Sequence, residues 1–222
     1  MNARLTILVS TVLAILPAGA QDFPAWPDTY VARLQAFALV QTLNAEVLAS
    51  RSSTLTLEAW CRDHHLASEP RIVAEVAREV AKTPTAEQRQ HLQVSLQEEV
   101  KYRRVRLRCG TRVLLEADNW YVPGRLTPEM NRLLDTTSTP FGKAVQLLQP
   151  YRQTFAVKLL WSPLPDGWER SSTTPLPRNN GPLSIPDALF EHRAVLYTRE
   201  HQPFAEVDEF YQRQLLAFPP PR

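Results

Sequence analysis

Residues 102–122 read YRRVRLRCGTRVLLEADNWYV, and this stretch decides the fold class. The run 102–109 alternates charged and apolar side chains, and a second β-prone run, 113–122, follows after a Gly-Thr pair. Two β-prone runs around a turn that contains Gly are typical of a β-hairpin. A Pro-Gly pair comes next, and because Pro cannot donate to a strand ladder, we expect the second strand to end there.

The arginines of the first run divide between the two faces of the predicted strand. Side chains alternate across a strand, so Arg103 shares a face with the apolar residues, whereas Arg104 and two later arginines point to the other face. A solvated surface Arg is the simple interpretation of each of them. An Arg on an apolar face can instead project into a pocket and hold a carboxylate with its two-pronged guanidinium. The alternation favours Arg103 for that role.

The rest of the chain alternates helical and extended segments. Helical signals occur at 31–49, 55–64, 83–93, 126–134 and 143–148, and β-prone runs at 71–80, 152–161, 189–198 and 203–216. The first of these runs, which is rich in β-branched residues but alternates poorly, fits a strand or a helix. Hairpin-forming strands with helices between them favour an α+β fold. We expect an antiparallel sheet of about six strands with helices packed on one side.

The first predicted helix, 31–49, has apolar residues at helical spacing. These residues are Val31, Leu34, Phe37, Ala38, Leu43 and Leu48. We expect this apolar stripe to pack on the sheet.

Residues 1–20 have the pattern of a secretory signal peptide. Arg4 supplies the positive start, residues 5–16 form a short apolar run, and small residues before Gln21 make an A-x-A cleavage site. The apolar run is shorter than the roughly 20 residues that a transmembrane helix needs. An uncleaved anchor or a buried helix is the alternative. We expect cleavage after Ala20, a periplasmic or secreted protein, and no stable membrane insertion after cleavage.

The composition is that of an ordinary globular protein. The chain has 222 residues, 44% of them hydrophobic, which suits one domain over residues 21–222 with a sizeable core. A formal net charge of +2 gives no electrostatic case for nucleic-acid binding. Prolines concentrate in a stretch that we expect to be a Pro-rich loop, 162–186, either a lid over a site or a surface excursion.

The cysteines and histidines give little sign of cross-links or metal binding. Cys61 and Cys109 could pair in an oxidising compartment, but one lies in a predicted helix and the other at a hairpin end. We favour two buried free thiols. His64 and His65 are adjacent, so they point in different directions from a helix, and no third ligand follows at metal spacing. We expect no metal and no cofactor.

The order of these features resembles the chorismate lyase family. The matching features are the strand with Arg103 and Arg104, the turn after it, Pro123 at the end of the second strand, and Thr-Pro-Phe-Gly at 139–142. That family removes pyruvate from chorismate to give 4-hydroxybenzoate. The resemblance covers about residues 43–218 and implies the same α+β fold. The UTRA ligand-binding domains of transcriptional regulators use this fold without turnover.

The resemblance implies a binding Arg and an acidic catalytic residue. When the family's spacing is counted back from Pro123 without a gap, the binding residue falls on Arg104. A gap of one residue in the hairpin turn places it on Arg103. The family's acidic residue in the last strand falls on Asp208 by ungapped spacing. Glu209 is the alternative, because it lies between two apolar residues of one strand face and is more suited to point inward.

Three further residues complete the substrate-binding set that the resemblance implies. Ser53, before the second predicted helix, would lie close to the ligand, with Ser52 as an ordinary helix cap. Phe141 would form the pocket wall, where the family has the smaller Leu. Arg152 matches a basic position at the start of a later strand.

Two functions follow from the resemblance. A lyase acting on chorismate or a related small carboxylate would need Arg103 or Arg104 to face Asp208 or Glu209 across a closed cavity, with the acid assisting the departing ether oxygen. The alternative is a non-catalytic periplasmic protein that binds a small anionic aromatic or cyclic carboxylate. Export favours this alternative, because chorismate is a cytoplasmic metabolite. We expect a monomer with no nucleic-acid partner.

Overall fold

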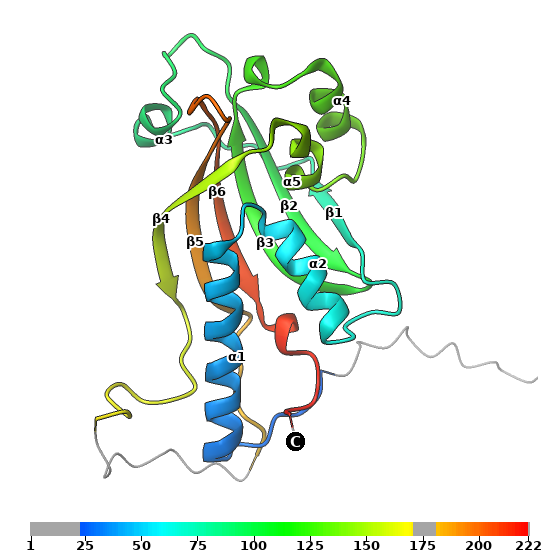
Figure 1. Ribbon diagram of the computed structural model, residues 1–222, viewed down its shortest axis with the longest axis vertical. Coiled ribbons are helices and arrows are strands. Elements are labelled where there is room, and N and C mark those ends of the chain that lie inside the picture. Colours follow the sequence, from blue (N-terminus) through cyan, green and yellow to red (C-terminus); the bar gives the residue numbers. More distant parts are fainter. Residues whose placement is uncertain (1–22, 171–180, 222) are drawn as a thin grey trace, which may run out of the picture.

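The computed structural model describes residues 23–170 and 181–221 (Figure 1). The expected signal segment 1–20 and the middle of the expected Pro-rich loop, 171–180, lie outside the described residues.

Six antiparallel strands form one sheet with the order β1-β2-β3-β6-β5-β4. The strands are β1 (Ile72–Ala77), β2 (Lys101–Cys109), β3 (Arg112–Tyr121), β4 (Tyr151–Leu159), β5 (Ala188–Tyr197) and β6 (Pro203–Gln212). The hairpins β2–β3 and β5–β6 meet at the centre, where β3 pairs with β6. The α+β class and the antiparallel sheet of six strands are therefore confirmed.

One face of this sheet, called the inner face below, is covered by helices (Figure 1). The covering elements are α1 (Tyr30–Ala49), α2 (Ser53–Asp63), α4 (Pro128–Thr136) and α5 (Phe141–Ala144), with short 3-10 turns η1 (Pro123–Arg125), η2 (Gln146–Leu148) and η3 (Arg213–Leu216) between or after strands. The short helix α3 (Ala86–His91) contacts the outer face, where His91 meets Glu206 of β6. None of the helices in the described part of the chain is long and apolar enough to cross a membrane.

The strand register decides which polar residues reach the inner face. Val105 pairs with Ala117, and Ala117 pairs with Glu209, so these three form one row across β2, β3 and β6. Arg103 pairs with Asn119 in the next row of the same face. Because side chains alternate, Arg103 and Glu209 both point toward the helices.

α1 packs on the sheet with a different face from the expected one. Its buried residues are Ala32, Ala36, Val40, Leu43 and Val47. Of the expected stripe only Leu43 is buried, whereas Val31 and Leu48 are 62% and 44% exposed. The predicted orientation was wrong because α1 has two apolar stripes, and the stripe of mostly small residues is the one that packs on the sheet.

Cys61 and Cys109 form a disulfide, with their Cα atoms 6.5 Å apart. The expectation of free thiols was wrong, because the last turn of α2 lies beside the end of β2. The turn at Gly110 has φ +57°, and a Cβ there would lie 2.9 Å from the Cβ of Ala67 in the segment after α2. Glycine thus lets the hairpin end come close enough for the two sulfurs to meet.

Candidate functional site

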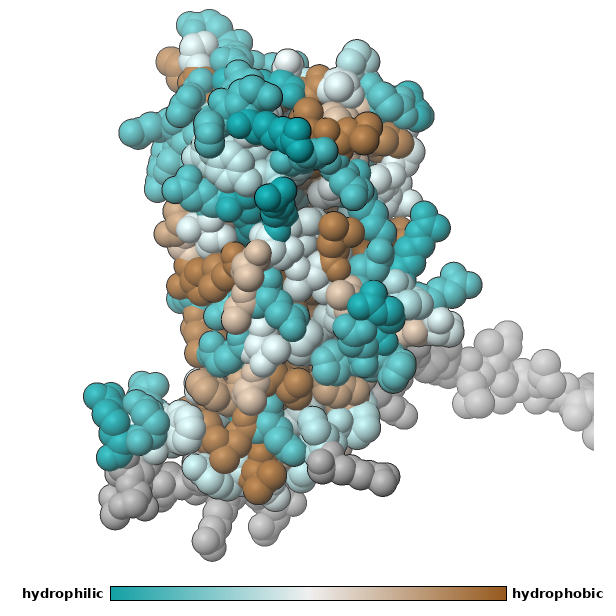
Figure 2. All heavy atoms as spheres, viewed as in Figure 1, coloured by the Kyte–Doolittle hydropathy of each residue, from teal (hydrophilic) through white to brown (hydrophobic). Residues whose placement is uncertain are grey.

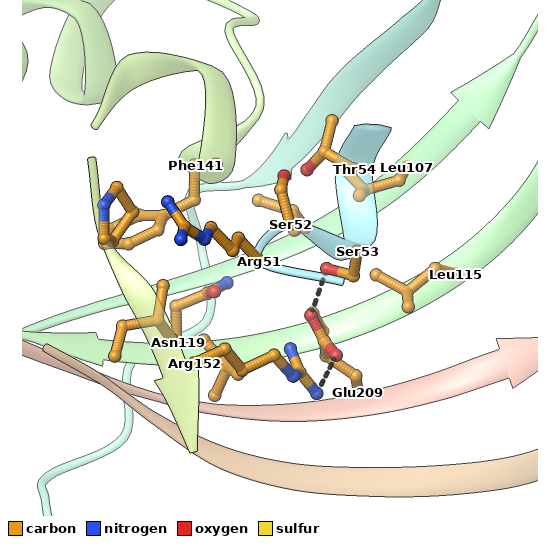
Figure 3. A pocket seen from close by; sticks show the side chains of 16 residues that line it. Arg51, Ser52, Ser53, Thr54, Leu107, Leu115, Asn119, Phe141, Arg152 and Glu209 are labelled. Carbon is orange, nitrogen blue, oxygen red and sulfur yellow. Dashed lines mark hydrogen bonds and ion pairs between the residues drawn. The ribbon is translucent and has the colours of Figure 1, made fainter. Parts of the chain in front are cut away.

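A small pocket lies between the inner face of the sheet and the first turns of α2 and α5 (Figure 3). Its volume is about 40 Å³, enough for a few water molecules. Polar side chains gather at one part of it, among them Arg51, Ser53, Asn119, Arg152 and Glu209. Apolar residues of β2, β3 and β6 form the floor, and Phe141 forms part of the wall.

Glu209 is the centre of this pocket's hydrogen bonding. Ser53 Oγ donates to Oε1 at 2.7 Å, and the Tyr211 hydroxyl donates to Oε2 at 2.9 Å. Arg152 Nη2 lies 2.8 Å from Oε2, a distance that makes an ion pair (Figure 3). Burial raises the pKa of Glu209, but Arg152 and the two hydroxyl donors outweigh it and hold the pKa below the usual value.

Arg152 keeps its charge although it is almost completely buried. Burial lowers the pKa of Arg152, yet the attraction of Glu209 more than compensates, and the net shift is upward. Its Nε donates to Thr154 Oγ1 at 3.2 Å. The Nη2 contact with Glu209 has the distance of an ion pair without the alignment of a hydrogen bond. Arg152 and Glu209 therefore form a buried pair in which both members are ionised.

The local sequence explains why Ser53 reaches Glu209. Ser52 is the N-cap of α2 and accepts from the Leu55 amide at 3.4 Å, which leaves the next hydroxyl free to point into the pocket. Gly142 of the Thr-Pro-Phe-Gly motif packs directly on this turn. A Cβ at Gly142 would lie 2.9 Å from Ser52 Oγ and 3.0 Å from Thr54 Oγ1. Any larger residue at position 142 would therefore have to displace these two hydroxyl groups.

Arg103 lines a different and larger cavity, of about 370 Å³, between β1, β2, β3 and α4. The Arg103 side chain is buried, and its Nη2 donates to the Thr139 carbonyl at 3.0 Å. Its Nε and Nη1 have no hydrogen-bond partner among the described residues. Burial lowers the pKa of Arg103 to about 10, so the guanidinium still carries its charge at neutral pH.

The two cavities are neighbours on the inner face. Asn119 lines the small pocket and donates from Nδ2 to the Arg103 carbonyl at 3.1 Å. Phe141 packs on Tyr121, a residue of the larger cavity, with ring centres 5.5 Å apart. The segment that carries Thr139 and Phe141 therefore lies between Arg103 and Glu209.

Arg104 and Asp208 point to the outer face, away from both cavities. Arg104 Nη1 lies 3.3 Å from Asp118, and Nη2 lies 3.3 Å from Glu116, so its charge is neutralised there. Asp208 is half-buried; burial, followed by the nearby carboxylate of Glu191, raises its pKa to about 6. The outer face thus has its own set of compensated charges.

The structure brings together four of the seven residues considered at the sequence level: Ser53, Phe141, Arg152 and Glu209. It does not place Arg103 or Arg104 opposite Asp208 or Glu209 across one closed cavity, because Arg152 takes the position beside the carboxylate. Sequence reasoning missed Tyr211 and Asn119. Tyr211 shares a strand face with Glu209, a signal that alternation contains, whereas the position of Asn119 depends on pairing between β2 and β3.

No group of three or more His, Cys, Asp or Glu residues suited to a metal ion occurs within residues 23–170 and 181–221.

The fold and this site define an α+β domain with buried charged side chains and two cavities between its sheet and its helices. The chain belongs to the same family as the uncharacterized protein y4mC of Sinorhizobium fredii (strain NBRC 101917 / NGR234). The two are 44% identical over 218 residues, which cover 96% of this chain and 92% of that protein. No family model matches the chain.

Solved structures of similar fold include the effector domain of PhnF from Mycobacterium smegmatis, with a TM-score of 0.45 and 12% identity over 73% of this chain and 88% of that chain. The possible transcriptional regulator YydK from Bacillus subtilis has a TM-score of 0.39 and 16% identity over 63% of this chain. The match spans 57% of YydK. These likenesses concern the fold alone. With TM-scores under 0.5, they carry no argument about function.

We expect Glu209→Gln to destabilise the protein strongly, because it leaves the buried Arg152 cation without its counter-charge. The free energy of unfolding at pH 7 should fall by about 3–5 kcal/mol. The double variant Arg152→Met/Glu209→Gln should recover much of that loss, since no buried charge then remains unpaired. Urea denaturation followed by circular dichroism measures both effects.

Asp208→Asn on the outer face is the matched control. The raised pKa of Asp208 means that the folded state binds its proton more tightly than the unfolded state does. The contribution of protonated Asp208 to the free energy of unfolding is therefore fully present below about pH 4, and it is lost as the pH rises through about 6. Asp208→Asn should stabilise the protein at pH 8 by about 1 kcal/mol, after allowance for solvent screening. If Glu209→Gln and Asp208→Asn lowered the free energy of unfolding equally at pH 8, the two carboxylates would not differ in the way described here.

Proposed function

We propose that the chain is a small-molecule-binding protein whose ligand presents a carboxylate or similar anionic group to Arg103. The observation that supports this most is the missing partner of the guanidinium: Nε and Nη1 are buried and bond to no group of the described chain. A buried cation with unused donors is costly. An anion entering the adjoining cavity of about 370 Å³ could accept from these nitrogens once the Arg103 side chain turns toward it, because both nitrogens are covered in the ligand-free chain.

The surroundings of Arg103 suit a ligand with a ring. Lys101 and Asp135 at the cavity form an ion pair at 2.9 Å and so compensate each other, while Arg78 adds another positive charge. Tyr121 and Leu134 supply apolar surface. A positive centre beside an aromatic and aliphatic wall matches a small aromatic or cyclic carboxylate.

The geometry supports binding better than turnover. Lyase chemistry as the resemblance implies it needs a protonated acid near the leaving ether oxygen. Glu209 is held ionised by Arg152 and lies in the other pocket, and Asp208 lies on the other side of the sheet. Neither of these two carboxyl groups lines the cavity of Arg103, and the carboxyl group that does, Asp135, is paired with Lys101. A binding role without catalysis, as in UTRA domains, is therefore our conclusion for this site.

We expect 4-hydroxybenzoate, as the first of a panel of small carboxylates, to raise the unfolding temperature of the wild-type protein. At a ligand concentration 100 times the dissociation constant, the stabilisation should be about 2.7 kcal/mol. Arg103→Met should abolish it and leave the ligand-free protein at least as stable, because an unpaired buried charge is removed. Arg104→Met, which loses only partly exposed ion pairs, should respond to ligand like the wild type. Thermal melts and titration calorimetry measure these effects.

Other outcomes of this experiment are equally informative. Stabilisation by a carboxylate that persists in Arg103→Met would place the ligand elsewhere and overturn the proposal. No response to any carboxylate, or to phosphate, would remove the anion-binding role. Incubation of the same samples with chorismate tests turnover. Formation of 4-hydroxybenzoate and pyruvate that depends on Arg103 would replace binding by lyase activity.

We infer, separately, that the domain is exported. The signal-peptide pattern of residues 1–20 supports this, and so does the Cys61–Cys109 disulfide, because disulfides persist mainly in oxidising compartments. Expression of residues 1–222 in a Gram-negative host, followed by fractionation and thiol alkylation, should give a periplasmic chain that begins at Gln21. Both cysteines should resist alkylation until a reductant is added. A cytoplasmic chain with alkylated thiols and an intact N-terminus would contradict export.

A further inference from the structure

The side of α1 that faces away from the sheet carries no charged residue. Its members are Tyr30, Val31, Leu34, Ala38, Gln41, Thr42, Ala45, Leu48 and Ala49. The two charged residues of the helix, Arg33 and Glu46, lie on its flanks, and Arg33 is already paired with Asp28 at 2.5 Å. Surface helices normally turn their charged residues to solvent, so this face is unusual.

This face is accessible along the length of the helix. Figure 1 shows α1 at the front of the helical layer, with no other described helix or strand lying over it. On the same side, Figure 2 shows brown and pale side chains along the position of α1, with teal ones between them. The side chains of Val31, Tyr30 and Leu48 are 62%, 47% and 44% exposed.

Six residues of this face are spaced as in a coiled coil. They are Val31, Leu34, Ala38, Gln41, Ala45 and Leu48, which follow one another at intervals of 3, 4, 3, 4 and 3 residues. This is the a/d spacing of a heptad pattern, and it is called the α1 seam below. The residues that pack on the sheet form a separate stripe. α1 thus has one apolar side for its own domain and one that lacks a partner in the described chain.

We propose that the α1 seam binds the α1 seam of a second copy of this chain in an antiparallel pair. With the two-fold axis between residues 39 and 40, Val31 lies opposite the partner's Leu48, and Leu34 lies opposite the partner's Ala45. Ala38 lies opposite the partner's Gln41. Each layer then combines a larger residue with one that complements it, and the central polar Gln41 fixes the register.

The seam fits a second copy better than an unrelated partner because it is complementary to itself. A two-fold axis brings like charges together wherever a charge lies near it, and the α1 seam has none. The positions directly beside the seam are also uncharged, with Gln35 and Thr42 on one side and Phe37 and Asn44 on the other. Repulsion between copies is therefore absent along the whole contact.

The length of the helix limits the strength of this contact. Twenty residues span about 30 Å, so the pair of helices lies at the lower end of the sizes of stable interfaces. A dimer that dissociates at micromolar concentration is the result. This differs from the expectation of a monomer, and it goes beyond the proposed ligand binding without depending on it.

Sedimentation equilibrium of the protein expressed from residues 1–222, over about 1–100 μM, tests the proposal. The wild type should change from monomer to dimer within this range. Val31→Glu and Leu48→Lys should each raise the dimer dissociation constant at least about tenfold. In the double variant Val31→Glu/Leu48→Lys, the dimer dissociation constant should return to within about threefold of the wild-type value, because each Glu then faces a Lys of the partner. Within one helix the two positions are about 25 Å apart and cannot pair.

Glu46→Lys is the matched control, because it changes an exposed charge on the same helix outside the seam and should leave the dimer intact. Circular dichroism should show that all variants fold, since each changed side chain is exposed. A wild type that stays monomeric at 100 μM overturns the proposal. So does a dimer that withstands Val31→Glu. Rescue that fails in the double variant would exclude the antiparallel register.

Discussion

The buried ion pair between Arg152 and Glu209 is the interaction on which the rest of the site depends. Glu209 comes from the central strand β6, and Arg152 comes from the edge strand β4, which pairs with β5 rather than with β6. Two hydroxyl donors, from Ser53 and Tyr211, complete the coordination of the carboxylate. The Ser53 hydrogen bond ties this pair to α2, and the two charges of the pair compensate each other within the small pocket.

This division of charges gives the two cavities of the inner face a different electrostatic character. The small pocket is electrically balanced, because its buried cation and its buried anion are in contact. The larger cavity has a buried cation, Arg103, two of whose donors bond to no group of the described chain; the carboxylate that lines this cavity, Asp135, is paired with Lys101. Proteins tolerate such an unpaired charge mainly where function requires it, since replacing it usually stabilises the fold. Ligand binding at Arg103 is the role that makes this cost intelligible.

Much of this arrangement could be predicted from the sequence, because it depends on alternation. The alternation of side chains along a strand assigned Arg103 to the apolar face and Arg104 to the opposite face. It also favoured Glu209 over Asp208 as the acid that points toward the helices. Alternation could not show which cation meets Glu209, since that depends on how β4 joins the sheet. Nor could it orient α1 or show the disulfide. A helix with two apolar stripes fits a sheet either way, and the approach of two cysteines 48 positions apart is set by tertiary packing.

A crystal structure of the wild-type protein grown with a small aromatic carboxylate tests the central claim most directly. The account predicts ligand density in the cavity between β1, β2, β3 and α4, with a carboxylate oxygen within about 3.2 Å of Nε or Nη1 of Arg103. It also predicts that the Arg152–Glu209 pair is intact in the same crystal. The account is contradicted if a protein carboxylate or carbonyl occupies both nitrogens of Arg103, or if the ligand displaces Glu209 from Arg152.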